Sequence, residues 1–126
     1  NQDWSCHVMG APISGVYNAV HAATLTALIP SWMEYVLPAD PARFARFAKN
    51  VLGVSDAGDD LETAREGVSA LRAFYQELGM PLTLSALGVE ASKLNELAKM
   101  AIGGGKIGSI RPVNAEEIEE ILNLAY

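Results

Sequence analysis

The sequence predicts an all-α fold, and three observations lead to this class. Apolar residues recur at spacings of three and four over most of the chain, which is the period of a helix with one buried face. No stretch alternates with period two, so there is no strand signal. Residue types that start and stop helices flank the periodic stretches. At 126 residues, the chain 1–126 is one domain long enough to bury a core without disulfides.

The first 37 residues predict two helices, over 4–16 and 20–37, with a turn at Tyr17 and Asn18 between them. Four residues inside these spans are poor helix formers. The residues expected to disturb the first helix are Gly10, Pro12 and Gly15, and Pro30 is expected to kink the second.

A third helix is predicted over 41–52. Asp40 is an N-cap residue, Pro41 occupies the first helical position and Gly53 ends the helix. One face is apolar, and the opposite face is basic and expected in solvent. The apolar face holds Phe44, Phe47, Ala48, Val51 and Leu52, and the basic face holds Arg43, Arg46 and Lys49.

Three further helical segments complete the chain. The pattern Asp59-x-x-Glu62 predicts a capping box that begins a helix over 61–78, which Gly79 and Pro81 stop. A single turn is expected at 83–87, a helix over 94–102, a loop over 103–112, and a last helix after Asn114-x-x-Glu117. The glycines at 103–105 follow no strand and lack the Gly-Lys-Ser/Thr ending of a phosphate-binding loop.

The charges are distributed unevenly along the chain. The formal net charge is -6, which argues against a nucleic-acid partner. Residues 4–33 contain no Asp, Glu, Lys or Arg, yet the segment is too short and too polar to span a membrane. A stretch without charge is normally buried, and 30 residues are many to bury in so small a domain. We therefore expect part of this surface to pack against something outside the chain.

Both histidines of the chain lie in this uncharged stretch. His7 and His21 fall on the two first helices, and an antiparallel helix pair would bring their rings to one point. Neutral imidazoles in an apolar setting suit Fe, Zn or Ni, but two ligands do not close a site. The alternative is two buried histidines, each bonded to a backbone carbonyl. Cys6 and His7 are neighbours that point apart on a helix, which disfavours a nucleophile pair. Four aromatic residues are expected in the core, namely Trp4, Tyr17, Trp32 and Tyr35.

The segment Asp3-Trp4-Ser5-Cys6-His7 is followed by Tyr17-Asn18-Ala19-Val20-His21, which places two histidines 14 positions apart. This is the most specific of several motifs that resemble the iron-containing (group III) alcohol dehydrogenases, in particular the butanol dehydrogenase and NADPH-dependent aldehyde reductase branch. The resemblance continues in order to the end of the chain. The further matching segments are 28–36, 40–44, 78–81, 84–88, 107–113 and 115–118.

The resemblance implies that this chain is the carboxy-terminal helical domain of a dehydroquinate-synthase-like fold, with the amino-terminal nucleotide-binding domain absent. His7 and His21 would supply two of four ligands, one Asp and three His, to a divalent metal, Fe or alternatively Zn. The missing domain would hold NAD(P), and the substrate would be a small alcohol or aldehyde. The resemblance places no catalytic and no NAD(P)-binding residue in this chain, so the isolated chain is expected to be inactive.

The sequence departs from the family pattern at three positions. Ala11 stands where a further histidine is usual, Asn18 where Asp is common and Ala22 where Gly is common. Because Ala11 cannot relay a proton, a non-catalytic helical interaction module descended from the family is the alternative function. An exposed apolar face also favours homo-oligomers. The single cysteine fits a reducing compartment, so a cytoplasmic location is expected.

Overall fold

The computed structural model describes residues 2–126 and confirms the all-α prediction. Within these residues there is no strand, and a single antiparallel bridge pairs Ile107 with Val113. The six α-helices are α1 (Ser5–Tyr17), α2 (His21–Val36), α3 (Pro41–Leu52), α4 (Asp60–Glu77), α5 (Leu94–Ile102) and α6 (Ala115–Leu124). Short 3-10 turns occupy Leu37–Ala39, Ser85–Leu87 and Ala91–Lys93.

The helix boundaries follow the capping signals of the sequence. Asp40 accepts a hydrogen bond from the backbone N–H of Arg43 at 3.3 Å, and Asn114 exchanges both bonds of a capping box with Glu117. At α4 the side chain of Asp59 accepts from the backbone N–H of Glu62 at 2.9 Å, which is one half of the predicted box. Because these side chains satisfy first-turn N–H groups, the local sequence determines where each helix begins.

The prolines within the first two helices do not interrupt them. Pro12 lies inside α1 and Pro30 inside α2, and both helices continue past them. The disturbance expected at Pro12 therefore does not end α1. Proline removes one hydrogen bond of the helix, and burial of α1 and α2 against their neighbours outweighs this local loss.

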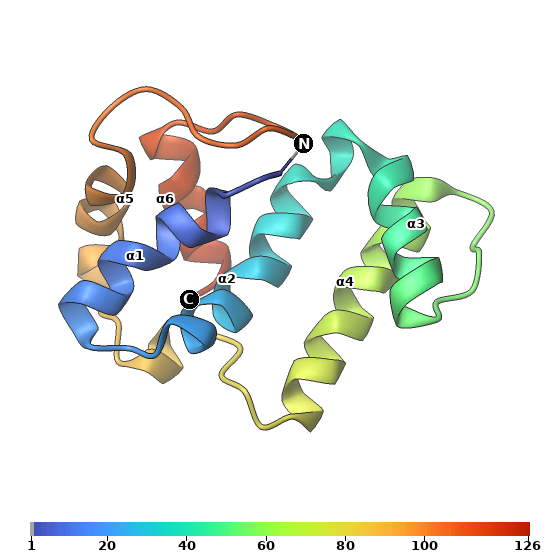
Figure 1. Cartoon of the computed structure of the whole chain (residues 1–126), viewed down its shortest axis with the longest axis horizontal. Coiled ribbons are helices and arrows are strands. Elements are labelled where there is room, and N and C mark those ends of the chain that lie inside the picture. Colours follow the sequence, from blue (N-terminus) through green and yellow to red (C-terminus); the bar gives the residue numbers. More distant parts are fainter. Residues whose placement is uncertain (1) are drawn as a thin grey trace.

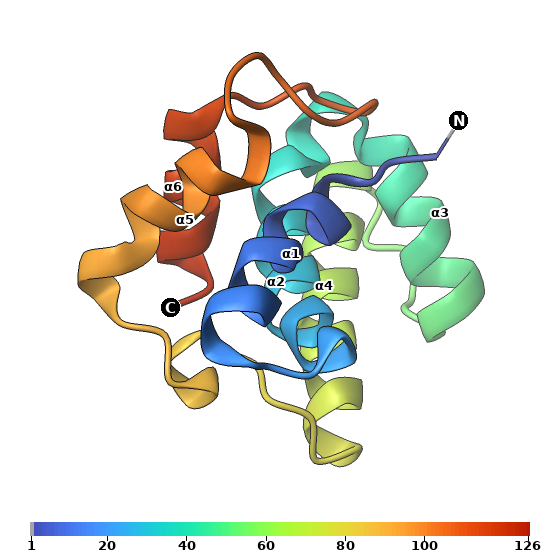
Figure 2. The same ribbon diagram turned by 60° about the vertical axis from the view of Figure 1, so that its left-hand side comes forward.

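Helix α2 lies at the centre of the molecule and contacts α1, α4 and α6. The α3–α4 hairpin stands on one side of it and the α5–α6 pair on the other (Figures 1 and 2). The hairpin helices approach closely at Gly67, where an added Cβ would lie 2.5 Å from the Cβ of Ala48. A glycine at this position therefore sets the distance between α3 and α4.

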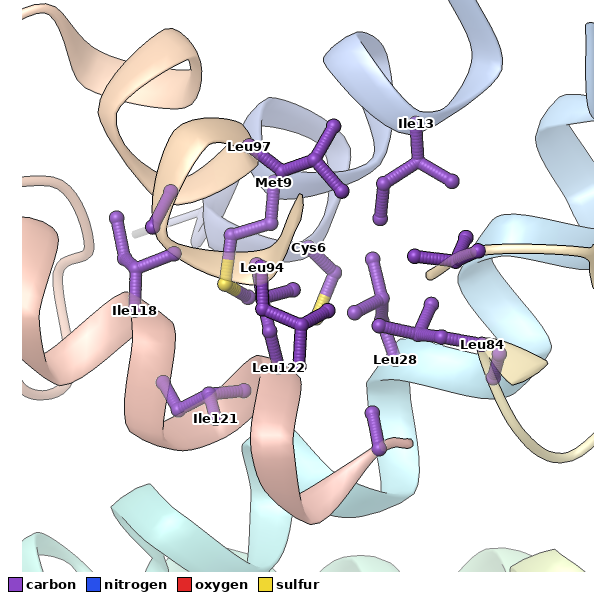
Figure 3. Close-up of a cluster of buried hydrophobic side chains, with 14 of the residues drawn as sticks. Cys6, Met9, Ile13, Leu28, Leu84, Leu94, Leu97, Ile118, Ile121 and Leu122 are labelled. Carbon is purple, nitrogen blue, oxygen red and sulfur yellow. The ribbon is translucent and has the colours of Figure 1, made fainter. Parts of the chain in front are cut away.

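Two hydrophobic clusters form the core, one on each side of α2. The larger unites α1, α2, α5 and α6, and side chains such as Met9, Leu28 and Ile121 interdigitate there (Figure 3). The smaller joins α2 to α3 and α4 through residues that include Phe44 and Leu71. In the part of the chain that the structure describes, no helix is long and apolar enough to cross a membrane.

Candidate metal site

The structure brings the two histidines together. The ring centroids of His7 and His21 are 5.3 Å apart, and the ring planes are inclined by 54°. A tight antiparallel hairpin would not give this contact, because His7 lies ten residues, or about 15 Å, before the end of α1. Instead, the connection 18–20 runs back along α1, so that α2 begins beside the middle of that helix (Figure 1).

The connection and the helix contact each depend on one residue. Asn18 adopts the left-handed conformation with φ 50°, which lets the chain leave α1 sharply. Gly10 faces α2, and an added Cβ there would lie 2.8 Å from Oγ1 of Thr24. Thr24 is itself fixed, because its hydroxyl donates to the backbone carbonyl of His21 at 2.7 Å. The contact of Gly10 with Thr24 therefore places the first turn of α2 against α1.

Both histidines lie on a surface without charge. His7 and His21 are exposed, which excludes the alternative of two buried rings bonded to carbonyls. We call the exposed residues around them the uncharged face. It consists of Trp4, His7, Ala11, Gly15, Val16, Asn18, Val20, His21 and Ala22. Its large side chains are well exposed, with Val20 at 72% and Trp4 and Val16 at 55%.

This face agrees with one expectation from the sequence and corrects another. Part of the stretch 4–33 is not buried within this chain, as expected, and it lies open on α1 and the start of α2. Trp4, expected in the core, is more than half exposed, whereas Tyr17, Trp32 and Tyr35 are partly buried against the clusters. The reason is that α1 has apolar residues on all sides, so hydropathy does not distinguish its inner face from its outer face.

The separation of the rings fits two ligands of one metal. A metal about 2.1 Å from one nitrogen of each ring, at a tetrahedral angle near 109°, places the ring centroids roughly 5.4 Å apart. The observed separation of 5.3 Å is close to this value. Among residues 2–126 there is no group of three or more His, Cys, Asp or Glu side chains that could hold a metal. A metal on this face could therefore take at most two such ligands, His7 and His21, from the described residues.

The segment before α1 carries a contact that the sequence did not predict. The Asp3 carboxylate accepts hydrogen bonds from the N–H and hydroxyl of Ser5, and also from the backbone N–H groups of Ser109 and Ile110 at 2.7 and 3.0 Å. Burial raises the pKa of Asp3, but these hydrogen bonds outweigh it, so the pKa lies below its ordinary value. No local pattern in the sequence signals this contact, because Ser109 and Ile110 lie more than 100 residues from Asp3.

Neither Cys6 nor Ala11, the neighbouring side chains on α1, offers a reactive group to the site. Cys6 is buried, and burial followed by the nearby charge of Asp3 raises the pKa of its thiol well above the ordinary value. A thiol in this state is a poor nucleophile, in agreement with the sequence analysis. Ala11 lies one turn after His7 on the uncharged face and presents a methyl group there.

The whole chain matches a known family. The model of the Fe-containing alcohol dehydrogenase family, C-terminal, covers residues 1–126. The chain belongs to this family. It is 39% identical to NADH-dependent butanol dehydrogenase A of Clostridium acetobutylicum, a match that covers 100% of this chain and 33% of that protein. It is 29% identical to the NADPH-dependent aldehyde reductase YqhD of Escherichia coli over 78% of this chain and 25% of that protein.

Solved structures of family members confirm the fold. The crystal structure of NADH-dependent butanol dehydrogenase A from Thermotoga maritima matches with a TM-score of 0.89 at 29% identity, over 98% of this chain and 33% of that one. A structure of E. coli YqhD matches with a TM-score of 0.90 at 25% identity, over 99% of this chain and 32% of that one. The chain thus spans about one third of the length of these relatives.

Proposed function

We propose that this chain acts as the carboxy-terminal, metal-binding third of an iron-type, NAD(P)-dependent alcohol dehydrogenase or aldehyde reductase. In this proposal His7 and His21 supply two ligands to a divalent metal at an interface with a nucleotide-binding domain. The observation that carries the proposal is the pairing of the two rings 5.3 Å apart on an exposed face. Membership of the Fe-containing alcohol dehydrogenase family supports the choice of Fe, with Zn as the alternative.

The chain would contribute neutral ligands in an apolar setting. The bound metal would act as a Lewis acid on the oxygen of a small alcohol or aldehyde. Because residues 4–33 contain no carboxylate, the segment that supplies the two histidines contributes no negative charge that would reduce the polarising effect of the metal. When another domain covers the uncharged face, Trp4, Val16 and Val20 exclude water from the space beside the rings.

The other components of the reaction would come from outside this chain. NAD(P) would bind to the preceding nucleotide-binding domain, and NADH-dependent and NADPH-dependent relatives both occur among the matches. Ala11 offers no group that could move a proton, so the proton of the alcohol would leave through water or through a residue of the other domain. We place the enzyme in the cytoplasm, in keeping with the single unpaired cysteine of this chain.

A fusion protein tests the ligand assignment. In it, this chain replaces the matched third of the C. acetobutylicum butanol dehydrogenase A, and metal content is measured by mass spectrometry after purification with Fe²⁺. His7→Ala and His21→Ala should each lose most of the bound metal, since removing one of few ligands opens the site. Val20→Ala, a change on the same face beside His21, is the matched control and should keep its metal. Unchanged metal content in both histidine variants would show that the assignment is wrong.

The same fusion distinguishes the enzyme hypothesis from the alternative of a non-catalytic interaction module. The methyl group of Ala11, which cannot move a proton, favours the module. Oxidation of butanol with NAD⁺ supports the enzyme, whereas retained metal without any turnover supports the module. The isolated 126-residue chain should be inactive, because it lacks two of the expected ligands and a site for NAD(P). It should also self-associate through the uncharged face, which sedimentation at rising concentration would reveal.

A further inference from the structure

The carboxylate of Asp3 joins two segments that are more than 100 residues apart. One oxygen accepts the backbone N–H of Ser5 at 3.0 Å together with the Ser5 hydroxyl. The other accepts the backbone N–H groups of Ser109 and Ile110, at 2.7 and 3.0 Å, and the Ser109 hydroxyl at 3.4 Å. Hydrogen bonds to a charged acceptor are the stronger kind, so Asp3 fastens the first turn of α1 to the loop before α6.

The loop on the other side of this contact is itself held firmly. The bridge between Ile107 and Val113 closes it with two backbone hydrogen bonds of 3.0 and 2.8 Å. Arg111 fixes it to two helices, because its guanidinium pairs with Glu117 at 3.0 Å and lies 4.5 Å from the centre of the Tyr35 ring. Asp3 therefore connects α1 to a rigid part of the molecule.

The approach of the loop to α1 leaves no room for a side chain. Gly108 has φ +105°, and an added Cβ would lie 2.8 Å from Oγ of Ser5 and 3.0 Å from the carbonyl oxygen of Arg111. The same Cβ would lie 3.5 Å from the outer carboxylate oxygen of Asp3. Glycine at this position allows the loop to reach the start of α1, and Asp3 then holds it there.

Trp4 lies between Asp3 and Ser5 in the chain, and its ring contacts His7. Its ring centroid is 4.9 Å from that of His7, with the planes inclined by 70°, an edge-to-face arrangement. The indole N–H donates to the side chain of Gln2 at 3.2 Å, so the ring is held from its polar end as well. Trp4 follows Asp3 directly, and the next backbone N–H, that of Ser5, donates to the Asp3 carboxylate. The direction of the indole therefore depends on that carboxylate.

We propose that Asp3 is a positioning residue for His7. Its carboxylate binds residues 109 and 110 to the first turn of α1 and so keeps the Trp4 ring in contact with the imidazole. This contact fixes the orientation in which His7 would bind a metal. This inference rests on the proposed function only in taking His7 as a metal ligand. Residues behind a ligand that fix its orientation commonly influence metal affinity. Asp3 acts here through Trp4 and the backbone rather than through a direct bond to the ring.

The test uses the 126-residue chain and two readouts, the NMR signals of the histidine ring protons and the affinity for Co²⁺, followed by paramagnetic broadening of those signals. Asp3→Asn keeps the size of the side chain, but its single amide oxygen can accept from only one of the two sets of donors, Ser5 or Ser109 with Ile110, and its NH2 group faces the other set. It should shift the His7 ring signals and weaken Co²⁺ binding roughly tenfold, the lower end for a group behind a ligand. Trp4→Ala should give both effects, and Trp4→Phe, which retains an aromatic ring, should restore most of the affinity.

Asp40→Asn is the matched control. Asp40 also caps a helix with its carboxylate, at α3, and its loss should leave the His7 signals and the Co²⁺ affinity unchanged. The inference is overturned if Asp3→Asn leaves both readouts at wild-type values, or if Asp3→Asn and Asp40→Asn change them equally. If the wild-type chain binds Co²⁺ no better than His7→Ala, the metal site itself fails, and the ring signals still decide whether Asp3 orients His7.

Discussion

Helices α1 and α3 are of similar length, yet they relate to solvent in opposite ways. Helix α3 buries Phe44 and Ala48 and exposes Arg46, as an amphipathic surface helix does. Helix α1 buries Ile13 but exposes Val16, and it has no charged residue on either face. The outer side of α1 thus has the composition of an interior, although in this chain it is open.

The comparison separates two reasons for an apolar residue in a small domain. On α3 most apolar residues serve the core of this chain, with Val51 an exception at 66% exposed, and the charged residues interact with water. On α1 only the inner half serves the core, and the outer half surrounds the two histidines. An exposed apolar surface of this kind is typical of a face that another part of a protein covers.

Two truncations of apolar side chains on α1 should differ greatly in their effect on the stability of the chain. Ile13→Ala removes a fully buried side chain and should lower the free energy of unfolding by about 2–5 kcal/mol. Val16→Ala, three residues later and 55% exposed, should change it by less than about 0.5 kcal/mol. Urea denaturation of both variants measures the two changes in the free energy of unfolding. Equal losses would mean that the outer face of α1 is buried in solution, for example by self-association.

Two glycine substitutions compare the hairpin with α1. Gly67→Ala forces a Cβ against Ala48 and should cost about 1–3 kcal/mol by overpacking, with faster hydrogen exchange in α3 and α4. Gly15→Ala on α1 meets nothing within 4 Å and should stabilise the chain by up to about 1 kcal/mol, because alanine favours the helix. Thermal unfolding with amide exchange measures both. If Gly67→Ala stabilised the chain instead, α3 and α4 would be able to move apart without a loss of stability.

The contribution of Asp3 should depend on pH. Since the folded state lowers its pKa, the charged carboxylate stabilises the fold above the unfolded value of about 3.9, and this stabilisation is lost as the pH falls through the lower folded value. The wild type should therefore be more stable than Asp3→Asn at pH 6, and the gap should narrow below about pH 4. Denaturation of both proteins between pH 2.5 and 6, roughly the window in which Asp titrates, tests this. A difference in stability between the two proteins that grows as the pH falls would contradict the predicted direction of the effect.

Much of the fold could be predicted because its signals are local. The residues Asp40, Asp59 and Asn114 begin helices with their own side chains, and Gly53 ends one, so neighbours in the chain suffice to place these boundaries. The site was harder to predict. The motif around His7 and His21 identified the histidines, but their separation follows from the return of the connection 18–20 along α1. The bonds of Asp3 to a loop more than 100 residues away left no local trace.

The helical class, most of the helix boundaries, the resemblance to the family and the two candidate ligands follow from the sequence alone, because periodicity, caps and motifs can be read along the chain. Which side of α1 is covered, the exposure of Trp4 and Val16, and the bonds of Asp3 to Ser109 and Ile110 depend on the packing of distant segments. The physical reason is that an apolar residue has the same free energy of transfer from water on either face of a helix. Which face is buried depends on where the other helices lie.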